Sequence, residues 1–272
     1  MKRLVCLLAF LSLLAAAITG CQQRPVVAEA APPIPLPTLV ELPGGQAYIG
    51  DQSNQGDLDE RPVQEITLKP FFISQNEITF NEYDAFAKAT GRLLPVDATW
   101  GRGSKPVINV SWGDAEAYTL WLSRQTDSKW RLPSELEWEY AARAGQLSQF
   151  QTGNQPESLC RVANIADQSA RNAGNEWQIS QCNDNVVNTS SVGLYPPNRF
   201  GLHDMHGNVW EWTSDCYRLY SQPTSKRRAC EMKVIRGGSF QTSASSARFS
   251  NREAMSTNTR INQIGFRVVK EK

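Results

Sequence analysis

The sequence predicts an α+β fold with little regular secondary structure, and three observations lead to this class. Patterns typical of amphipathic helices are confined to residues 79–143. Short alternating segments typical of strands precede them and reappear near the carboxyl end. From residue 145 onward, asparagine, serine, glycine and aspartate dominate the chain. We therefore expect a single loop-rich domain over residues 39–272.

The expected amino-terminal strands comprise residues 40–42, 47–49 and 63–68, in which polar and apolar side chains alternate. A Pro-Gly-Gly turn at residues 43–45 and an acidic loop at residues 57–60 separate them. This arrangement predicts hairpins at the edge of a sheet. Residues 233–236 and 266–269 alternate in the same way and are expected to be strands as well.

Three helices are expected, each with a recognisable start. Thr79 caps a run that ends at Gly91, and Ser111 opens a second helix. The third begins at Pro133, because proline suits the first turn of a helix. Acidic residues 135 and 137 follow it, and their charge complements the helix dipole.

The amino-terminal residues are typical of an export signal. Lys2 and Arg3 precede an apolar run over residues 4–18, shorter than the ~20 residues that a membrane-spanning helix needs. Residues 18–21 resemble a bacterial lipobox, so residues 1–20 are expected to be a signal peptide and Cys21 to be acylated. Gln22 differs from the aspartate of an inner-membrane retention signal, which favours the periplasmic face of the outer membrane. An uncleaved apolar anchor is the alternative.

Residues 21–38 are expected to tether the domain, because prolines among alanines favour extended conformers and cannot build a core. The formal net charge is +1, so we expect no nucleic-acid partner, and the basic cluster at residues 226–228 is too short to change this. The lipid on Cys21 is the expected attachment to a membrane.

Four cysteines remain after Cys6 and Cys21 are set aside, an even number in a chain expected in an oxidising compartment. They allow three pairings. We favour Cys160 with Cys182 and Cys216 with Cys230, because each pair brackets a loop-like segment. A catalytic or metal-binding thiol is the alternative, but the chain has no Cys-x-x-Cys spacing.

Seven separated segments resemble the formylglycine-generating-enzyme (sulfatase-modifying-factor) domain family, in the family's order. They are Asn76-Glu77-Ile78-Thr79, residues 106–112, residues 131–143, residues 195–198, Gly207-Asn208-Val209-Trp210-Glu211-Trp212, Arg236-Gly237-Gly238-Ser239-Phe240 and Gly265-Phe266-Arg267. Together they cover nearly all of the mature domain. The resemblance implies a single domain with a loop-rich fold related to C-type lectins.

Two calcium sites are expected. Asp204, Gly207, Val209 and Glu211 offer two carboxylates and two main-chain carbonyls within one short segment, which suits a hard cation. The matching segment of the family's enzymes binds calcium. A second family site matches Asn164, the Ile165 carbonyl, Asp184 and the Val186 carbonyl. Loop acids bonded to backbone amides are the alternative. A transition-metal site at His203 and His206 would need further ligands.

The family's oxidases hold Cu(I) through two thiols shortly after the Gly-Gly-Ser motif. The matching positions here are Thr242 and Ala247, so no copper is expected, because Cu(I) selects soft thiolates. A polar cleft nearby could hold a peptide or small ligand; its candidate residues are Ser239, Thr242, Ser243, Arg248, Arg252 and Trp210. Both arginines could instead be structural, bonded to buried carbonyls or to acids such as Glu211.

Non-catalytic binding is therefore the first functional hypothesis: a calcium-stabilised periplasmic lipoprotein that binds or regulates an envelope protein or peptide. By analogy of fold, the partner could belong to a secretion system of the type VI kind. The second hypothesis is an enzyme of altered chemistry, for example in the oxidative maturation of a peptide or a siderophore. Formylglycine formation itself is the third.

Overall fold

The computed structural model describes residues 34–222 and 230–272, and residues 34–272 form one compact unit. Its strands are β1 (Leu39–Leu42), β2 (Gly45–Ile49), β3 (Gln64–Leu68), β4 (Phe71–Ser74), β5 (Trp130–Arg131), β6 (Trp210–Cys216), β7 (Met232–Arg236), β8 (Arg252–Ser256), β9 (Ile264–Gly265) and β10 (Val269–Glu271). Its helices are α1 (Phe80–Thr90), α2 (Trp112–Thr126), α3 (Glu135–Arg143) and α4 (Gln168–Asn172), with 3₁₀ turns η1 (Leu58–Glu60), η2 (Pro156–Arg161) and η3 (Ala244–Ala247). The expected α+β class is confirmed.

Local sequence explains where α1, α2 and α3 begin. Thr79, Ser111 and Ser134 each accept a bond from the backbone three residues on, and an acidic side chain at that position bonds back to the cap. Each reciprocal pair satisfies two backbone donors that a helix start leaves open. Ser134 is the cap of α3, so the expected start at Pro133 is corrected: the proline precedes the cap.

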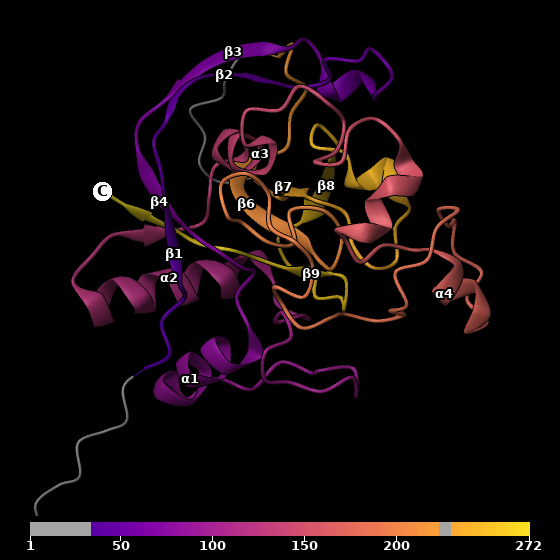
Figure 1. The fold of residues 1–272 in the computed structure, drawn as a ribbon. Coiled ribbons are helices and arrows are strands. Elements are labelled where there is room, and N and C mark those ends of the chain that lie inside the picture. The colour runs from indigo at the N-terminus through magenta and orange to yellow at the C-terminus, as the bar shows by residue number, and fades with distance from the viewer. Residues whose placement is uncertain (1–33, 223–229) are drawn as a thin grey trace, which may run out of the picture. The chain divides into compact units, whose positions relative to one another are not determined.

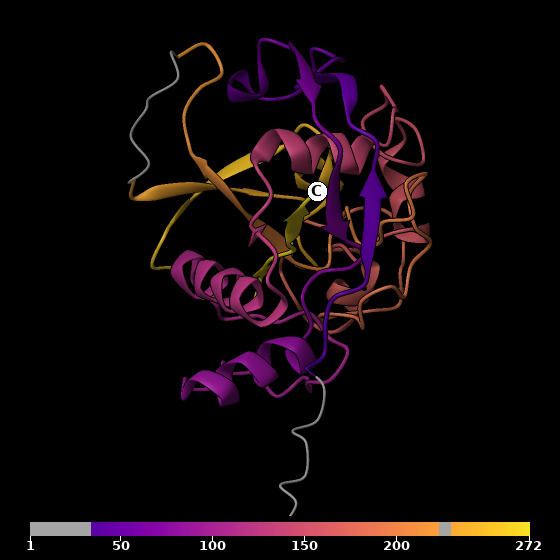
Figure 2. The same cartoon turned by 90° about the vertical axis from the view of Figure 1, so that its left-hand side faces the viewer.

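Two four-stranded sheets and one ribbon organise the unit. The first sheet has the order β1-β4-β10-β5, and the second has the order β8-β7-β6-β9. β2 and β3 form a separate antiparallel ribbon. In both views the ribbon lies beside α3, and α1 lies outside α2 at the opposite end (Figures 1 and 2).

The expected hairpins are therefore only partly right. β2 does pair with β3, but β1 pairs with β4, which periodicity did not indicate. The strand expected at 266–269 is wrong in its bounds, because β9 ends at Gly265 and β10 begins at Val269. The acidic segment 57–60 contains η1, and Glu60 at its end is fully buried.

Aromatic side chains fill the largest core cluster, between α1, α2 and the segment that joins β9 to β10. Tyr118 packs against Tyr83, Phe86, Trp121 and Phe266, with ring centroids 5.5–5.9 Å apart. Burial of such large apolar surfaces is the main term that holds a loop-rich domain together. No helix of the described residues is long and apolar enough to cross a bilayer.

Candidate functional site

Thr242 and Ala247, the two positions expected to match the family's thiols, both lie close to Gly238. Gly238 has a φ of +77°, and a Cβ there would lie 3.1 Å from both the Ala247 Cβ and the Thr242 Oγ1. Glycine is needed at this point for its left-handed conformation and for the close approach. The Thr242 hydroxyl accepts a bond from the Ser239 backbone N (2.8 Å) and donates to the Ser239 carbonyl (3.1 Å). The hydroxyl therefore closes a turn, and the buried Ala247 methyl offers no donor atom.

The other uncharged candidates for a cleft are held in or near the interior. Ser239 is fully buried and donates to Gln263 Oε1 at 3.3 Å. Ser243 is half-buried, and its hydroxyl lies 2.9 Å from that of Ser245. Trp210 is 5% exposed and belongs to the main core cluster. The structure thus gathers Ser239, Thr242 and Ser243 at one turn and places Trp210 in the core.

Arg248 and Arg252 each form a buried ion pair inside the fold, and neither pairs with Glu211. Arg248 forms two bonds of 2.7 Å with the two carboxylate oxygens of Glu60. Arg252 pairs in the same way with Glu135, at 2.7 and 2.6 Å. Both guanidiniums are buried, so these pairs join segments far apart in the sequence. Such forked contacts fix geometry as well as charge.

Substitution of Arg248 by glutamine should destabilise the fold by about 3 kcal/mol at pH 7, because it leaves the buried Glu60 carboxylate without its cation. Burial acts to raise the pKa of Glu60, but hydrogen bonds from Arg248 and Ser250 outweigh it and hold the pKa below 4.5. The pair therefore stabilises the fold above pH 4.5, and this contribution is lost as the pH falls through the folded-state pKa. Urea unfolding at pH 7 and at pH 3.5 should show the difference between wild type and variant shrink. An equal difference in unfolding free energy between wild type and variant at both pH values would contradict this assignment. R124Q, which changes an arginine at an exposed position, is the control.

A buried acidic cluster surrounds the first expected calcium segment. Glu77, Asp204 and Glu211 are 1%, 3% and 0% exposed. Burial and the charges of Asp204 and Glu211 raise the pKa of Glu77 well above its usual value. Burial likewise raises the pKa of Asp204 to about 6. Arg267 is the guanidinium that faces all three acids, so the cluster holds more negative than positive charge when ionised. Glu77 belongs to the Asn76-Glu77-Ile78-Thr79 segment that resembles the family, but no role was predicted for it.

The carboxylate oxygens of Glu211 and Asp204 differ in the number of hydrogen bonds that they accept. Glu211 accepts two bonds from Arg267 (2.6 and 2.7 Å) and one from the Trp138 indole (2.7 Å). A carboxylate offers about four lone-pair directions, so one remains for a cation. Asp204 accepts a bond from the Gly193 backbone N, but its other oxygen is buried without a hydrogen-bond partner in the described residues. The donor set fits a hard cation held mainly through Asp204.

The second expected calcium segment is also assembled. Asp184 accepts bonds from the backbone N of Ile165 (2.9 Å) and of Val186 (2.8 Å), which brings the expected ligand residues together. The Asn164 side-chain oxygen is buried and has no hydrogen-bond partner in the part of the chain described. Burial raises the pKa of Asp184 to about 7, and the charge of Asp167 adds to the rise. Oxygen donors of this kind fit calcium.

The two segments touch each other. The Asn208 backbone N donates to the Asn164 carbonyl at 2.7 Å, and the Asn208 side chain donates to Glu77 at 2.6 Å. A Cβ at Gly207, where φ is +71°, would lie 2.0 Å from the Asn164 carbonyl oxygen. Glycine is therefore required at position 207 for the segments to meet.

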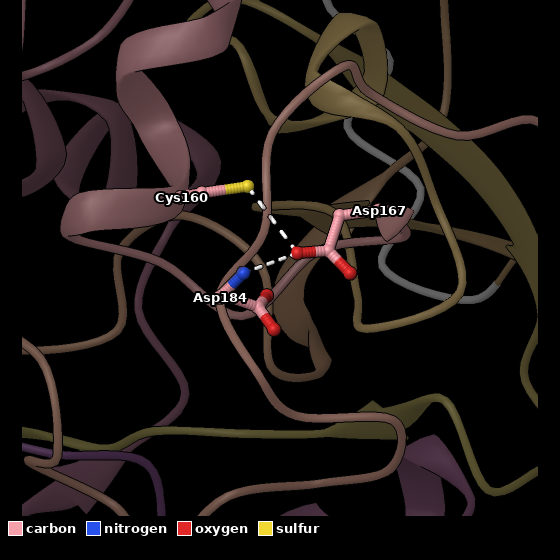
Figure 3. Close-up of side chains that lie close together, drawn as sticks. All are labelled: Cys160, Asp167 and Asp184. Atoms are coloured by element: carbon pink, nitrogen blue, oxygen red, sulfur yellow. Dashed lines mark hydrogen bonds between the residues drawn. The ribbon is translucent and has the colours of Figure 1, made fainter. Parts of the chain in front are cut away.

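Cys160, Asp167 and Asp184 form a further cluster beside the second segment, in which Asp167 bonds to the Asp184 backbone (Figure 3). The Cys160 sulfur lies 3.5 Å from an Asp167 oxygen. This sulfur belongs to the Cys160–Cys182 disulfide, so it has neither a proton to donate nor a thiolate to bind a metal. Both expected disulfides are present, the second joining Cys216 and Cys230.

Both histidine rings contact the backbone. His206 is buried with one ring nitrogen 2.6 Å from the Ala247 carbonyl, and the other accepts from the Gln151 backbone N at 3.2 Å. His203 lies 2.8 Å from the Tyr195 carbonyl. The expected acylation site at Cys21 and the basic cluster at residues 226–228 lie outside the described residues.

Comparisons with known proteins agree with this fold. Residues 24–272 match the family model for the sulfatase-modifying factor enzyme 1-like domain. The chain is 31% identical to the inactive C-alpha-formylglycine-generating enzyme 2 of Bos taurus, over 84% of this chain and 86% of that protein. It is 30% identical to the formylglycine-generating enzyme of Streptomyces coelicolor, over 74% and 78%.

Among solved structures, PvdO from Pseudomonas aeruginosa superposes with a TM-score of 0.74 at 31% identity, covering 87% of this chain and 95% of that one. Loop-rich α+β architecture, motif order and overall structure therefore agree, and the chain belongs to the sulfatase-modifying factor enzyme 1-like domain family.

Proposed function

We propose that this protein is a non-catalytic, calcium-stabilised binding or regulatory member of its family. The observation that carries the proposal is the pair Thr242 and Ala247, adjacent around Gly238 where the family's oxidases have thiols. Cu(I) selects soft ligands, and neither a hydroxyl nor a methyl group supplies one. The similarity to a relative named inactive supports the same conclusion.

Location and partner extend the proposal. Acylation of Cys21 would hold the domain at the periplasmic face of the outer membrane, with residues 21–38 as a tether. The partner would be an envelope protein or peptide, and an accessory role in a type VI-like secretion system fits such an anchored domain by analogy of fold. An enzyme of altered chemistry, acting on a peptide or a siderophore, is the second candidate.

Capture of envelope partners by the acylated protein, run beside an assay for aldehyde formation on a thiol peptide of the sulfatase type, tests the proposal. We expect a partner that is enriched reproducibly and no aldehyde. Aldehyde formation would end the proposal, and oxidation of another peptide group would favour the altered enzyme.

Calcium is the proposed structural ion at both oxygen-lined segments. Asp204 and Asn164 each bury an oxygen without a hydrogen-bond partner among the described residues, and the surrounding acids exceed the cations. Burial of an oxygen atom without a partner costs free energy, which a bound cation would offset. The ion would tie down loops that have little secondary structure.

Addition of calcium to chelator-treated protein should raise the melting temperature by roughly 5–10 °C for each site that it fills at a concentration 100 times that site's Kd. D204N should reduce this rise, because it removes a ligand charge. Without calcium, D204N should be at least as stable as wild type, because it relieves repulsion from Glu77 and Glu211. Differential scanning calorimetry with and without EGTA measures both effects.

An equal loss of stability with and without calcium would count against the site, and E157Q, which removes one charge at an exposed position, is the matched control. A substitution of Glu211 is unsuitable for this test, because it also breaks the buried pair with Arg267.

A further inference from the structure

A groove of about 890 Å³ lies between the segment that follows α1 and residues 260–262, next to the start of α2. Tyr83 and Val110, both buried, form its floor. Its volume is within the range of sites that enclose a ligand. None of the residues assigned to the calcium segments lines it.

The outer wall of the groove carries apolar side chains that face solvent. Leu93, Leu94 and Val96 are 95%, 46% and 68% exposed. Contiguous exposed aliphatic side chains on one segment are typical of a surface that a partner covers. The backbone of this segment is held in place: the Asn109 side chain donates to the Val96 carbonyl at 2.7 Å, and Arg102 donates to the Pro95 carbonyl at 2.8 Å. The wall is therefore preformed.

The charges that line the groove do not balance. Arg260 lies 2.6 Å from one oxygen of Asp114, and Arg92 lies 3.7 Å from the other. Asp114 also accepts bonds from the backbone and the hydroxyl of Ser111, at 2.9 and 2.7 Å. One carboxylate thus serves two guanidiniums and a helix cap, which leaves a net positive charge beside the apolar wall. Both arginines are half exposed, so a ligand can reach them.

Two residues that line the groove lie two positions along the chain from residues that contact the Ser239–Thr242 turn or its neighbour Phe240. Ile261 lines the groove, and Gln263, two residues on, accepts the bond from Ser239. Ala98 lines the groove, and Trp100 packs against Phe240 with ring centroids 5.2 Å apart.

We propose that this groove binds an extended peptide segment of a partner protein, in which a glutamate or aspartate is flanked by aliphatic side chains. The aliphatic side chains would cover Leu93 and Val96, and the carboxylate would pair with Arg92 and Arg260 through their planar donors. A peptide fits better than a compact anion, because the charged end and the exposed apolar wall must be filled together. The inference rests on the proposed binding function and names the chemistry of its partner.

Selection from a random heptapeptide phage library against the full-length chain tests this inference. Parallel selections use the double variant R92Q/R260Q and the control R124Q, which changes an exposed arginine of α2 outside the groove. We expect wild type and R124Q to enrich peptides with an acidic residue beside Leu, Ile or Val, and the double variant not to enrich them. A selected peptide should bind R92Q/R260Q about tenfold more weakly or worse, since charge-assisted hydrogen bonds are lost. L93S, which alters an exposed side chain, should weaken binding independently.

A double-mutant cycle completes the test: a selected peptide and its Glu→Gln variant are each measured against wild type and R92Q/R260Q. The second change should add little to the first, because both remove the same contact. Failure to enrich any peptide, enrichment of peptides without a carboxylate, or equal binding to the double variant would overturn the inference. So would self-association that R92Q/R260Q abolishes, because the occupant would then be a second copy. Aldehyde formation by the wild type would instead overturn the proposed function and leave these peptide results unchanged.

Discussion

Replacing Arg267 with methionine should lower the free energy of unfolding by about 3–5 kcal/mol, because it leaves buried carboxylates without their cation. Arg267 and Glu211 are both fully buried, and Arg267 also donates to the His203 carbonyl at 2.9 Å. The melting temperature should fall by roughly 6–20 °C. Thermal and urea unfolding, with calcium held constant, measure the loss.

The exposed pair Lys272–Glu41 provides the control, since its side chains are 58% and 49% exposed. K272M should cost less than about 1 kcal/mol, because solvent screens the pair. The double variant R267M/E211Q should be less destabilised than the sum of its two single variants, because each removes the same contact. A loss of less than 1 kcal/mol in R267M would contradict the role assigned to this pair.

Thiols placed at both Thr242 and Ala247 should create a Cu(I) site. In T242C/A247C the two new side chains would approach each other around Gly238. At present the Thr242 Oγ1 and the Ala247 Cβ are each 3.1 Å from the position that a Cβ at Gly238 would occupy. Loss of a residue that only orients a metal ligand lowers metal affinity about 10–100-fold. A direct ligand should contribute more than such a residue, so two new thiolates should raise the Cu(I) affinity by more than about a hundredfold. Competition with a chromophoric Cu(I) chelator measures the change.

The single variants T242C and A247C separate a paired site from a lone thiol. Each should bind Cu(I) more weakly than the double variant, because one thiolate cannot supply both ligands. Equal affinity of wild type and T242C/A247C would mean that these positions do not correspond to the family's thiols.

Local signals predicted the helices well, and long-range pairing is what the sequence could not supply. Caps such as Thr79 and Ser111 act within one turn, so they can be recognised from neighbouring residues. The partner of β1 is β4, and β10 lies between β4 and β5 although it ends the chain. Such pairings depend on contacts between distant residues, which periodicity does not encode.

The same distinction applies to the candidate site. Spacing within one short segment indicated the oxygens around Asp204, whereas the residues around Asp184 were indicated only by the resemblance to the family. The partners of the arginines were missed, because Arg248 meets Glu60 and Arg252 meets Glu135 across 188 and 117 residues. Glu211 was considered as their partner, but its carboxylate is engaged by Arg267 and Trp138. Buried charge pairs of this kind are fixed by the fold alone.

Oxygen uptake by the copper-treated wild-type chain, in the presence of a sulfatase-type thiol peptide, tests most directly whether Thr242 and Ala247 have ended the family's oxidase chemistry. We predict uptake no faster than in copper and peptide without protein, and no aldehyde in the peptide. Sustained uptake with stoichiometric aldehyde formation would contradict the proposal that this chain is non-catalytic.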